Sequence, residues 1–283
     1  MKFSALTTVL AAAVAVNAAP TWPKISPAAL SSGGLEHVSA YFNLLADKIS
    51  QGGGPAGLGG PNSPAAAAPS CDLSRAVLPQ APVNPLEPPS PGLVLKHVAV
   101  GRGTQNYTCD TSNPGAAPVA NGAMATLFNA SCVAASYPDV AGKLAALSLQ
   151  FPLSAFPTSD DETVRMGPSN LLVSGKHFFL DGKTPYFNLD TKNFGQVGHA
   201  TFSKKSGTDA PSNAPTGLQG EKAVAWLKLV AGGSDAVKIA ATGGLQEVYR
   251  VETAGGSPPA TCQGMAPTFE VEYATQYWFY AKP

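Results

Sequence analysis

Residues 269–280 read Phe-Glu-Val-Glu-Tyr-Ala-Thr-Gln-Tyr-Trp-Phe-Tyr, and their apolar and aromatic side chains alternate with other residues. Successive side chains of a β-strand point to opposite faces. The odd-numbered positions therefore share one face, on which Thr275 alone is neither aliphatic nor aromatic. The even-numbered positions, beginning with Glu270 and Glu272, share the other. The stretch predicts a long, half-buried strand.

Working outward from this stretch, the same period of two recurs along the chain, interrupted by clusters of Gly, Pro, Asn and Asp. Asp181-Gly182 predicts a hairpin, because this pair tolerates the positive φ angles of a type I′ turn. A helical pattern occurs at 138–149, with Ser136 as the expected cap and Pro138 in the first turn. The sequence therefore predicts an all-β fold, a β-sandwich or β-barrel with one or two minor helices. The further strands are expected at 92–100, 123–129, 171–180, 184–190, 196–203, 224–230, 236–241 and 246–252.

The first 70 residues have a different character. Residues 1–18 combine a positive start, an apolar run and small residues before Ala19, which predicts a signal peptide and a secreted, extracellular protein. Within 19–70, residues 35–50 predict a short amphipathic N-terminal helix, and 52–70 form a Gly/Pro/Ala-rich linker. The β domain is expected to occupy 71–283.

Charge and composition exclude some partners. The chain has 18 basic and 18 acidic residues, and only 13% of its residues are charged. Nucleic acids and anionic membranes attract concentrated positive charge. Neither is therefore expected as a partner, and the oligomeric state is left open.

Two N-x-[ST] sequons run directly into cysteines. Asn106 precedes Cys109 and Asn129 precedes Cys132, so both asparagines are predicted glycosylation sites. The four cysteines, which include Cys71 and Cys262, predict two disulfides in an exported protein. Four cysteines allow three connectivities.

Catalytic candidates are few among the four histidines. His177 precedes the predicted hairpin turn, Asp190 ends the next strand and His199 lies on the strand after it. If these strands pair, the three side chains are expected to converge on one sheet face, where they could bind a metal or perform acid–base chemistry. Hydrogen-bonded structural histidines are the alternative.

Aromatic and acidic residues offer two other sites. Phe179, Phe187 and Trp278 are candidate ligand-binding residues, because an exposed aromatic face can stack on a sugar ring. Glu270 and Glu272 share a strand face at about 7 Å by strand rise, a separation compatible with glycosidase carboxylates. The alternative for the three aromatic residues is that they pack in the core. The alternative for the two glutamates is that they lie on the solvent side of a half-exposed strand.

Several segments resemble a secreted family of unknown function that is common in fungi, has shorter bacterial relatives, and whose members are often labelled malate dehydrogenase. The resemblance covers roughly residues 71–283. It implies that Cys109 pairs with Cys262, which leaves Cys71 with Cys132; Cys109–Cys132 with Cys71–Cys262 is the other pairing considered. The segments are GRGTQNYTC (101–109), GKHFF (175–179), AWLKL (225–229), VYRVETAGG (248–256) and YATQYWFY (273–280).

The dehydrogenase label is not supported by the residues. A dinucleotide site needs a strand, a Gly-x-Gly-x-x-Gly turn and a helix. Gly101 and Gly103 follow a predicted strand, but the third position is Asn106 and a β-prone run comes next. These glycines are expected to lie in a turn of a β protein, and neither NAD-dependent activity nor any other cofactor is expected.

Two functional hypotheses follow. The first is a non-catalytic extracellular module that binds carbohydrate or a cell-wall surface. The second is an extracellular hydrolase or metal-dependent enzyme that uses His177, His199 and Asp190. A tight cluster in a concave pocket would favour the enzyme, and a flat aromatic strip would favour the binding module.

Overall fold

The computed structural model describes residues 71–151, 153–155, 165–166, 171–191, 195–233 and 237–283. The expected signal peptide at 1–18, the helix at 35–50 and the linker at 52–70 lie outside the described residues.

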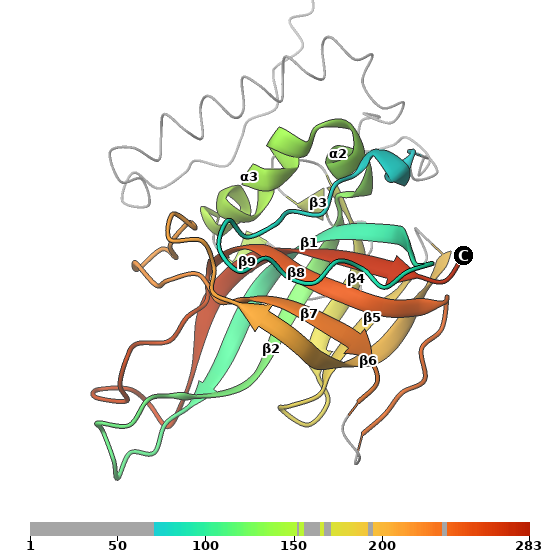
Figure 1. Ribbon diagram of the computed structural model, residues 1–283. Coiled ribbons are helices and arrows are strands. Elements are labelled where there is room, and N and C mark those ends of the chain that lie inside the picture. The colour runs from blue at the N-terminus through green and yellow to red at the C-terminus, as the bar shows by residue number, and fades with distance from the viewer. Residues whose placement is uncertain (1–70, 152, 156–164, 167–170, 192–194, 234–236) are drawn as a thin grey trace, which may run out of the picture.

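Eight antiparallel strands form a closed barrel in the order β2-β1-β9-β8-β7-β6-β5-β4, with β2 also paired to β4 (Figure 1). The all-β prediction is confirmed, and the β2–β4 pairing decides between the two expected architectures. A short strand, β3, extends the sheet beside β4. The strands are β1 (Val94–Thr108), β2 (Val119–Asn129), β3 (Arg165–Met166), β4 (Leu171–Phe179), β5 (Pro185–Thr191), β6 (Gly195–Thr208), β7 (Trp226–Ala231), β8 (Leu245–Gly255) and β9 (Thr268–Ala281).

The first strand corrects the interpretation of Gly101 and Gly103. β1 continues to Thr108, so both glycines lie within a strand and not in a turn. A Cβ at Gly101 would fall 2.6 Å from Cε2 of Tyr277, and one at Gly103 would fall 1.8 Å from the Met124 carbonyl oxygen. Glycine is therefore required here for close packing against the Tyr277 ring and the β2 backbone.

Two other local predictions need correction. The hairpin between β4 and β5 is present, but only Gly182 has a positive φ, +72°, so the turn is not type I′. The Asp181 carboxylate instead accepts hydrogen bonds from the backbone N–H groups of Lys183 and Thr184. The strand expected at 236–241 is irregular over its described residues 237–241.

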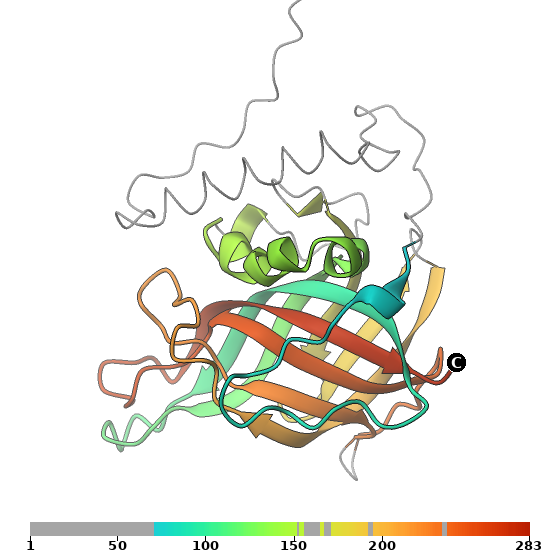
Figure 2. The same ribbon diagram turned by 45° about the horizontal axis from the view of Figure 1, so that its top comes forward.

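The helices lie on the outside of the barrel, over β1, β8 and β9 (Figure 2). They are α2 (Ser131–Ser136) and α3 (Pro138–Leu149), and short 3-10 turns occur at Leu73–Arg75 (η2) and Leu153–Ala155 (η3). α3 has the predicted bounds, but Tyr137, not Ser136, is its N-cap residue, without a side-chain cap bond. Among the described residues, no helix has the length and hydropathy to cross a bilayer.

The alternation of β9 gives the molecule two cores. Tyr273, Tyr277 and Phe279 point into the barrel and pack with Phe187. Trp278 points outward and packs in a second core, between the barrel wall and the helices, with residues that include Val140 and Leu144 of α3. β1, β8 and β9 are thus covered on both faces, because side chains fill the interior and the helices lie over their outer side.

The chain before β1 crosses the outer wall and is held by polar contacts. The side chains of Lys228 and Glu247 form an ion pair of 3.3 Å, each only 4% exposed. Lys228 Nζ donates to the Pro88 carbonyl, and Ser90 Oγ donates to Glu247. A disulfide joins Cys71, just before η2, to Cys132 in α2. The second disulfide joins Cys109 to Cys262, so the pairing is the one that the family resemblance implies.

Candidate functional site

The barrel wall separates the three catalytic candidates. His177 pairs with Phe187 and Phe187 with Ala200, so all three face the interior. His199 pairs with Asn188, one position along, and therefore faces outward. The expectation that His177, His199 and Asp190 converge on one face is wrong for His177.

Asp190 and His199 do meet, on the outer surface. Asp190 Oδ2 lies 2.7 Å from His199 Nδ1, and its Oδ1 accepts a hydrogen bond from the Gly198 N–H. The His199 side chain is 30% exposed. In the part of the chain that the structure describes, no group of three His, Cys, Asp or Glu side chains is placed to hold a metal ion. The pair therefore orients one imidazole but does not by itself form a metal centre.

His177 is a neutral side chain in an aromatic environment. Its ring stacks on Phe187, and the edge of Tyr277 lies close by. Nδ1 lies 2.9 Å from the Tyr186 carbonyl oxygen, which can only accept, so Nδ1 carries the proton and Nε2 presents a lone pair. Burial, and to a smaller degree the charge of Arg250, lower the pKa of His177 to about 3.

His177 lines a cavity of about 360 Å³ beside the β4–β5 hairpin, here called the hairpin cavity. Most of its wall is apolar or aromatic. Lys183 and Lys204 are exposed, and Arg250 is half-buried. The described lining includes no acidic side chain. The lining residues are His177, Phe179, Lys183, Thr184, Pro185, Phe187, Phe202, Ser203, Lys204, Leu227, Leu229, Arg250 and Tyr277.

Arg250 is less exposed than the two lysines of this lining. It pairs with Leu227 on β7 and with Tyr277 on β9, which directs its side chain inward. Nε and Nη2 donate to the Ala225 carbonyl at 3.2 and 2.9 Å. Nη1 lies 3.5 Å from Oε1 of Gln105, a long contact. No described carboxylate forms an ion pair with it.

Two phenols and an amide complete the polar interior. The hydroxyls of Tyr273 and Tyr277 lie 2.9 Å apart, and burial raises the pKa of both, so both stay neutral. Gln105 is 8% exposed, and within the described residues its Nε2 is buried without a hydrogen-bond partner.

The aromatic candidates do not form one exposed strip. Phe179 and Phe187 line the hairpin cavity, and Phe187 is fully buried. Trp278 is 2% exposed on the opposite face of the wall, where its Nε1 donates to Gln276. Its ring is covered by the outer core and offers no surface for a sugar. The flat platform expected from the sequence is therefore not formed by these three residues.

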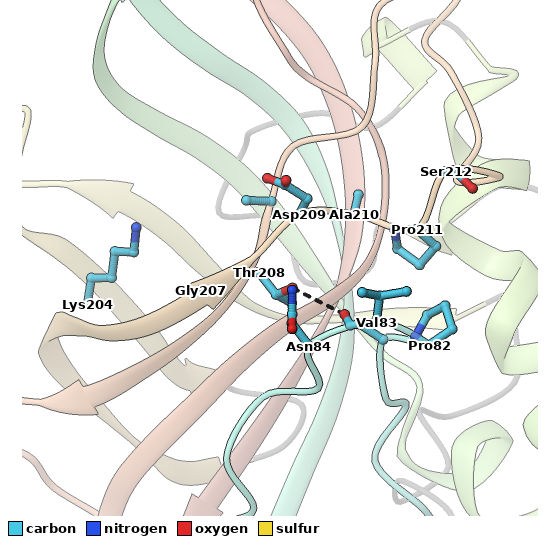
Figure 3. A pocket seen from close by; sticks show the side chains of 12 residues that line it. Pro82, Val83, Asn84, Lys204, Gly207, Thr208, Asp209, Ala210, Pro211 and Ser212 are labelled. Carbon is cyan, nitrogen blue, oxygen red and sulfur yellow. Dashed lines mark hydrogen bonds between the residues drawn. The ribbon is translucent and has the colours of Figure 1, made fainter.

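A second hollow, larger at about 670 Å³, lies between residues 81–84 and 207–212 (Figure 3). Thr208 Oγ1 donates to the Val83 carbonyl at 3.5 Å across it. Its wall consists mainly of proline, alanine and other small side chains, with Lys204 shared with the hairpin cavity and Asp209 as the acid. It lacks the converging buried polar groups of the hairpin cavity.

Residues 89–281 match the protein family described as "Protein of unknown function (DUF3455)". The chain belongs to this family. Neither the curated proteins nor the solved structures contain a match. The matched range covers the eight barrel strands, the helices α2 and α3 and all the residues that line the hairpin cavity.

Sequence reasoning missed Arg250, although a signal was present. The predicted strand 246–252 places Arg250 on the same face as Val248, and Val248 is fully buried. A cation on an apolar strand face needs a partner or a cavity. The predicted aromatic residues Phe179 and Phe187 do line the cavity, together with His177.

Proposed function

We propose that this DUF3455 protein is a non-catalytic extracellular binding module that holds one small, partly apolar ligand in the hairpin cavity. The observation that carries the proposal is the cavity itself. Eight-stranded barrels have interiors that side chains can fill or that can hold one small ligand. Here an inner core fills part of the interior, and a cavity of about 360 Å³ lies between aromatic and polar side chains beside the hairpin.

The lining supports binding more than catalysis. Small-molecule sites commonly have volumes of about 300–1,000 Å³, apolar walls and a few convergent polar groups. His177 is neutral and stacked, and the other candidates, His199 and Asp190, lie on the outer surface. The cavity therefore lacks the acid–base partners that the enzyme hypothesis needs.

An extracellular location is supported by the two disulfides, because such bonds persist in oxidising compartments. The predicted signal peptide at 1–18 and the sequons at Asn106 and Asn129 also favour secretion and glycosylation. A carbohydrate ligand fits this proposal only as a group small enough to enter the cavity, since Phe187 and Trp278 are buried.

The test uses a neutral fluorophore, N-phenylnaphthylamine, whose emission rises in apolar sites. Leu227→Trp fills the cavity, whereas Leu218→Trp makes the same change at a residue that is 44% exposed and lines neither hollow. We expect saturable binding to the native protein and to Leu218→Trp, and a large loss in Leu227→Trp. Binding that is equal in both variants, or that never saturates in the native protein, would overturn the proposal.

A further inference from the structure

We propose that the hairpin cavity selects an organic carboxylate, whose charged end pairs with Arg250 and whose apolar body lies against Phe179, Phe187 and Tyr277. This inference rests on the proposed function and names its ligand class. Within the described chain, Arg250 lacks the acidic partner that the buried cations of the barrel wall have.

Among the described residues, the two cations that are fully buried in the barrel wall have acidic partners. Arg102, on the outer face, forms an ion pair with Glu272. Lys228, also on the outer face, forms one with Glu247. Buried charges are paired or hydrogen-bonded because removing them from water is costly. Arg250 is half-buried, points into a cavity, and has no described carboxylate within ion-pair distance. A ligand anion would supply the missing partner.

The free hydrogen-bonding capacity of Arg250 suits a planar anion. A guanidinium has five N–H donors. Two are directed at the Ala225 carbonyl, and the long contact from Nη1 to Gln105 leaves that nitrogen weakly engaged. The remaining donors of Nη1 and Nη2 lie on adjacent nitrogens, an arrangement that matches the two oxygens of a carboxylate.

The surrounding groups favour a single negative charge. His177 presents a lone pair at Nε2 to the cavity. This nitrogen can accept a hydrogen bond from a ligand hydroxyl, but it repels a second anionic oxygen. Tyr277 stays a neutral hydroxyl. A dianionic phosphate would need more donors than one guanidinium provides. A carboxylate that also carries a hydroxyl could satisfy Arg250 and His177 together.

The rim adds long-range attraction. Lys183 and Lys204 are exposed, and no acidic side chain is present in the described lining to offset them. Clefts lined by one sign of charge raise the local concentration of an oppositely charged ligand.

The experiment compares three probes that share one aromatic body: naphthoate, naphthylmethanol and naphthylmethylamine. Calorimetry with the native protein should show naphthoate binding about ten- to a hundred-fold more tightly than the alcohol, as expected for hydrogen bonds to a charged group. The amine should bind most weakly. Equal affinity for acid and alcohol would overturn the inference without any variant being needed.

Substitutions at Arg250 test whether its guanidinium causes the preference for naphthoate. Arg250→Met should reduce naphthoate affinity to that of the alcohol and leave alcohol binding unchanged, and Arg250→Lys should restore part of the loss. Arg75→Met is the matched control, because Arg75 is exposed and does not line the cavity. If Arg250→Met retains naphthoate affinity while Leu227→Trp abolishes alcohol binding, the carboxylate inference fails and the binding module stands. If Leu227→Trp has no effect on any probe, the proposed function itself fails.

Discussion

The imidazole Nε2 of His97 lies 2.9 Å from the Ser174 hydroxyl and so connects β1 with β4, although β2 separates these strands in the sheet. Ser174 is the extra residue where the register between β2 and β4 shifts, and a bulge of this kind re-aims a side chain. The other ring nitrogen lies 3.2 Å from Ser131 Oγ at the start of α2. Two hydroxyls thus hold a buried, neutral histidine.

We predict that the protein loses stability in mild acid because of this histidine. Burial lowers the pKa of His97 from 6.5 to about 4. Below pH 6.5 the unfolded chain binds a proton that the folded state refuses, so the stabilisation is complete above 6.5 and is lost as the pH falls toward 4. The full effect is about 3 kcal/mol, and His177 acts in the same direction.

Urea unfolding between about pH 7 and pH 5, where most carboxylates remain ionised, measures how steeply the free energy of unfolding falls with pH. His97→Gln should reduce this slope and leave the part that His177 contributes. Ser174→Ala, which removes one hydrogen bond but keeps the imidazole, should lower stability by a similar amount at every pH. An unchanged slope in His97→Gln would contradict the assignment.

A second prediction concerns the buried ion pair on the outer wall. Lys228→Met leaves the Glu247 carboxylate buried with Ser90 and Tyr249 as its remaining hydrogen-bond partners. Removing one partner of a buried pair costs about 3–5 kcal/mol. Lys222→Met, the same change at an exposed lysine, should cost less than about 0.5 kcal/mol. Equal unfolding midpoints in the two variants would show that the pair contributes little.

The strands could be predicted from the sequence because each carries its own alternation. The odd-numbered face of 269–280 does point into the barrel and Trp278 does point away from it. Helix α3 was also predictable, since Pro138 and the apolar spacing mark it locally. The closure of the barrel could not be predicted, because the β2–β4 pairing joins residues about fifty positions apart and leaves no local signal in the sequence.

The candidate site was harder to predict because it depends on register between strands. The alternating pattern shows which residues share a face with His177 on its own strand, and which share one with His199. It does not show whether the two histidines lie on the same face of the sheet. The pairing of His199 with Asn188, and the register shift before Asp190, decide that question. A one-residue difference moves a side chain to the other face. His177 therefore lies on the inner face of the barrel, whereas His199 and Asp190 lie together on the outer face.

The third prediction separates the two disulfides. Cys71–Cys132 closes a loop of 61 residues and anchors the chain before β1 to α2. Replacing both cysteines with serine should cost up to about 4 kcal/mol, and should raise amide hydrogen exchange at residues 78–93 while the inner strands stay protected. The Cys109→Ser/Cys262→Ser variant should instead raise exchange near Cys109 and Cys262. If exchange at residues 78–93 rises equally in both variants, the anchoring role of the first disulfide is wrong.

The last prediction distinguishes a structural from a catalytic role for the two glutamates of β9. Arg102 is fully buried, and its guanidinium donates to Glu272 as well as to the Ser148 and Phe151 carbonyls. Glu270 lies on the same strand face but is exposed. Glu272→Gln should therefore destabilise the fold by about 2 kcal/mol, less than a fully buried pair because the Glu272 side chain is 38% exposed. Glu270→Gln should change stability by less than about 0.5 kcal/mol. Thermal and urea unfolding of the two variants measure the difference, and glycosidase chemistry would require both to abolish a hydrolytic activity while leaving stability equal.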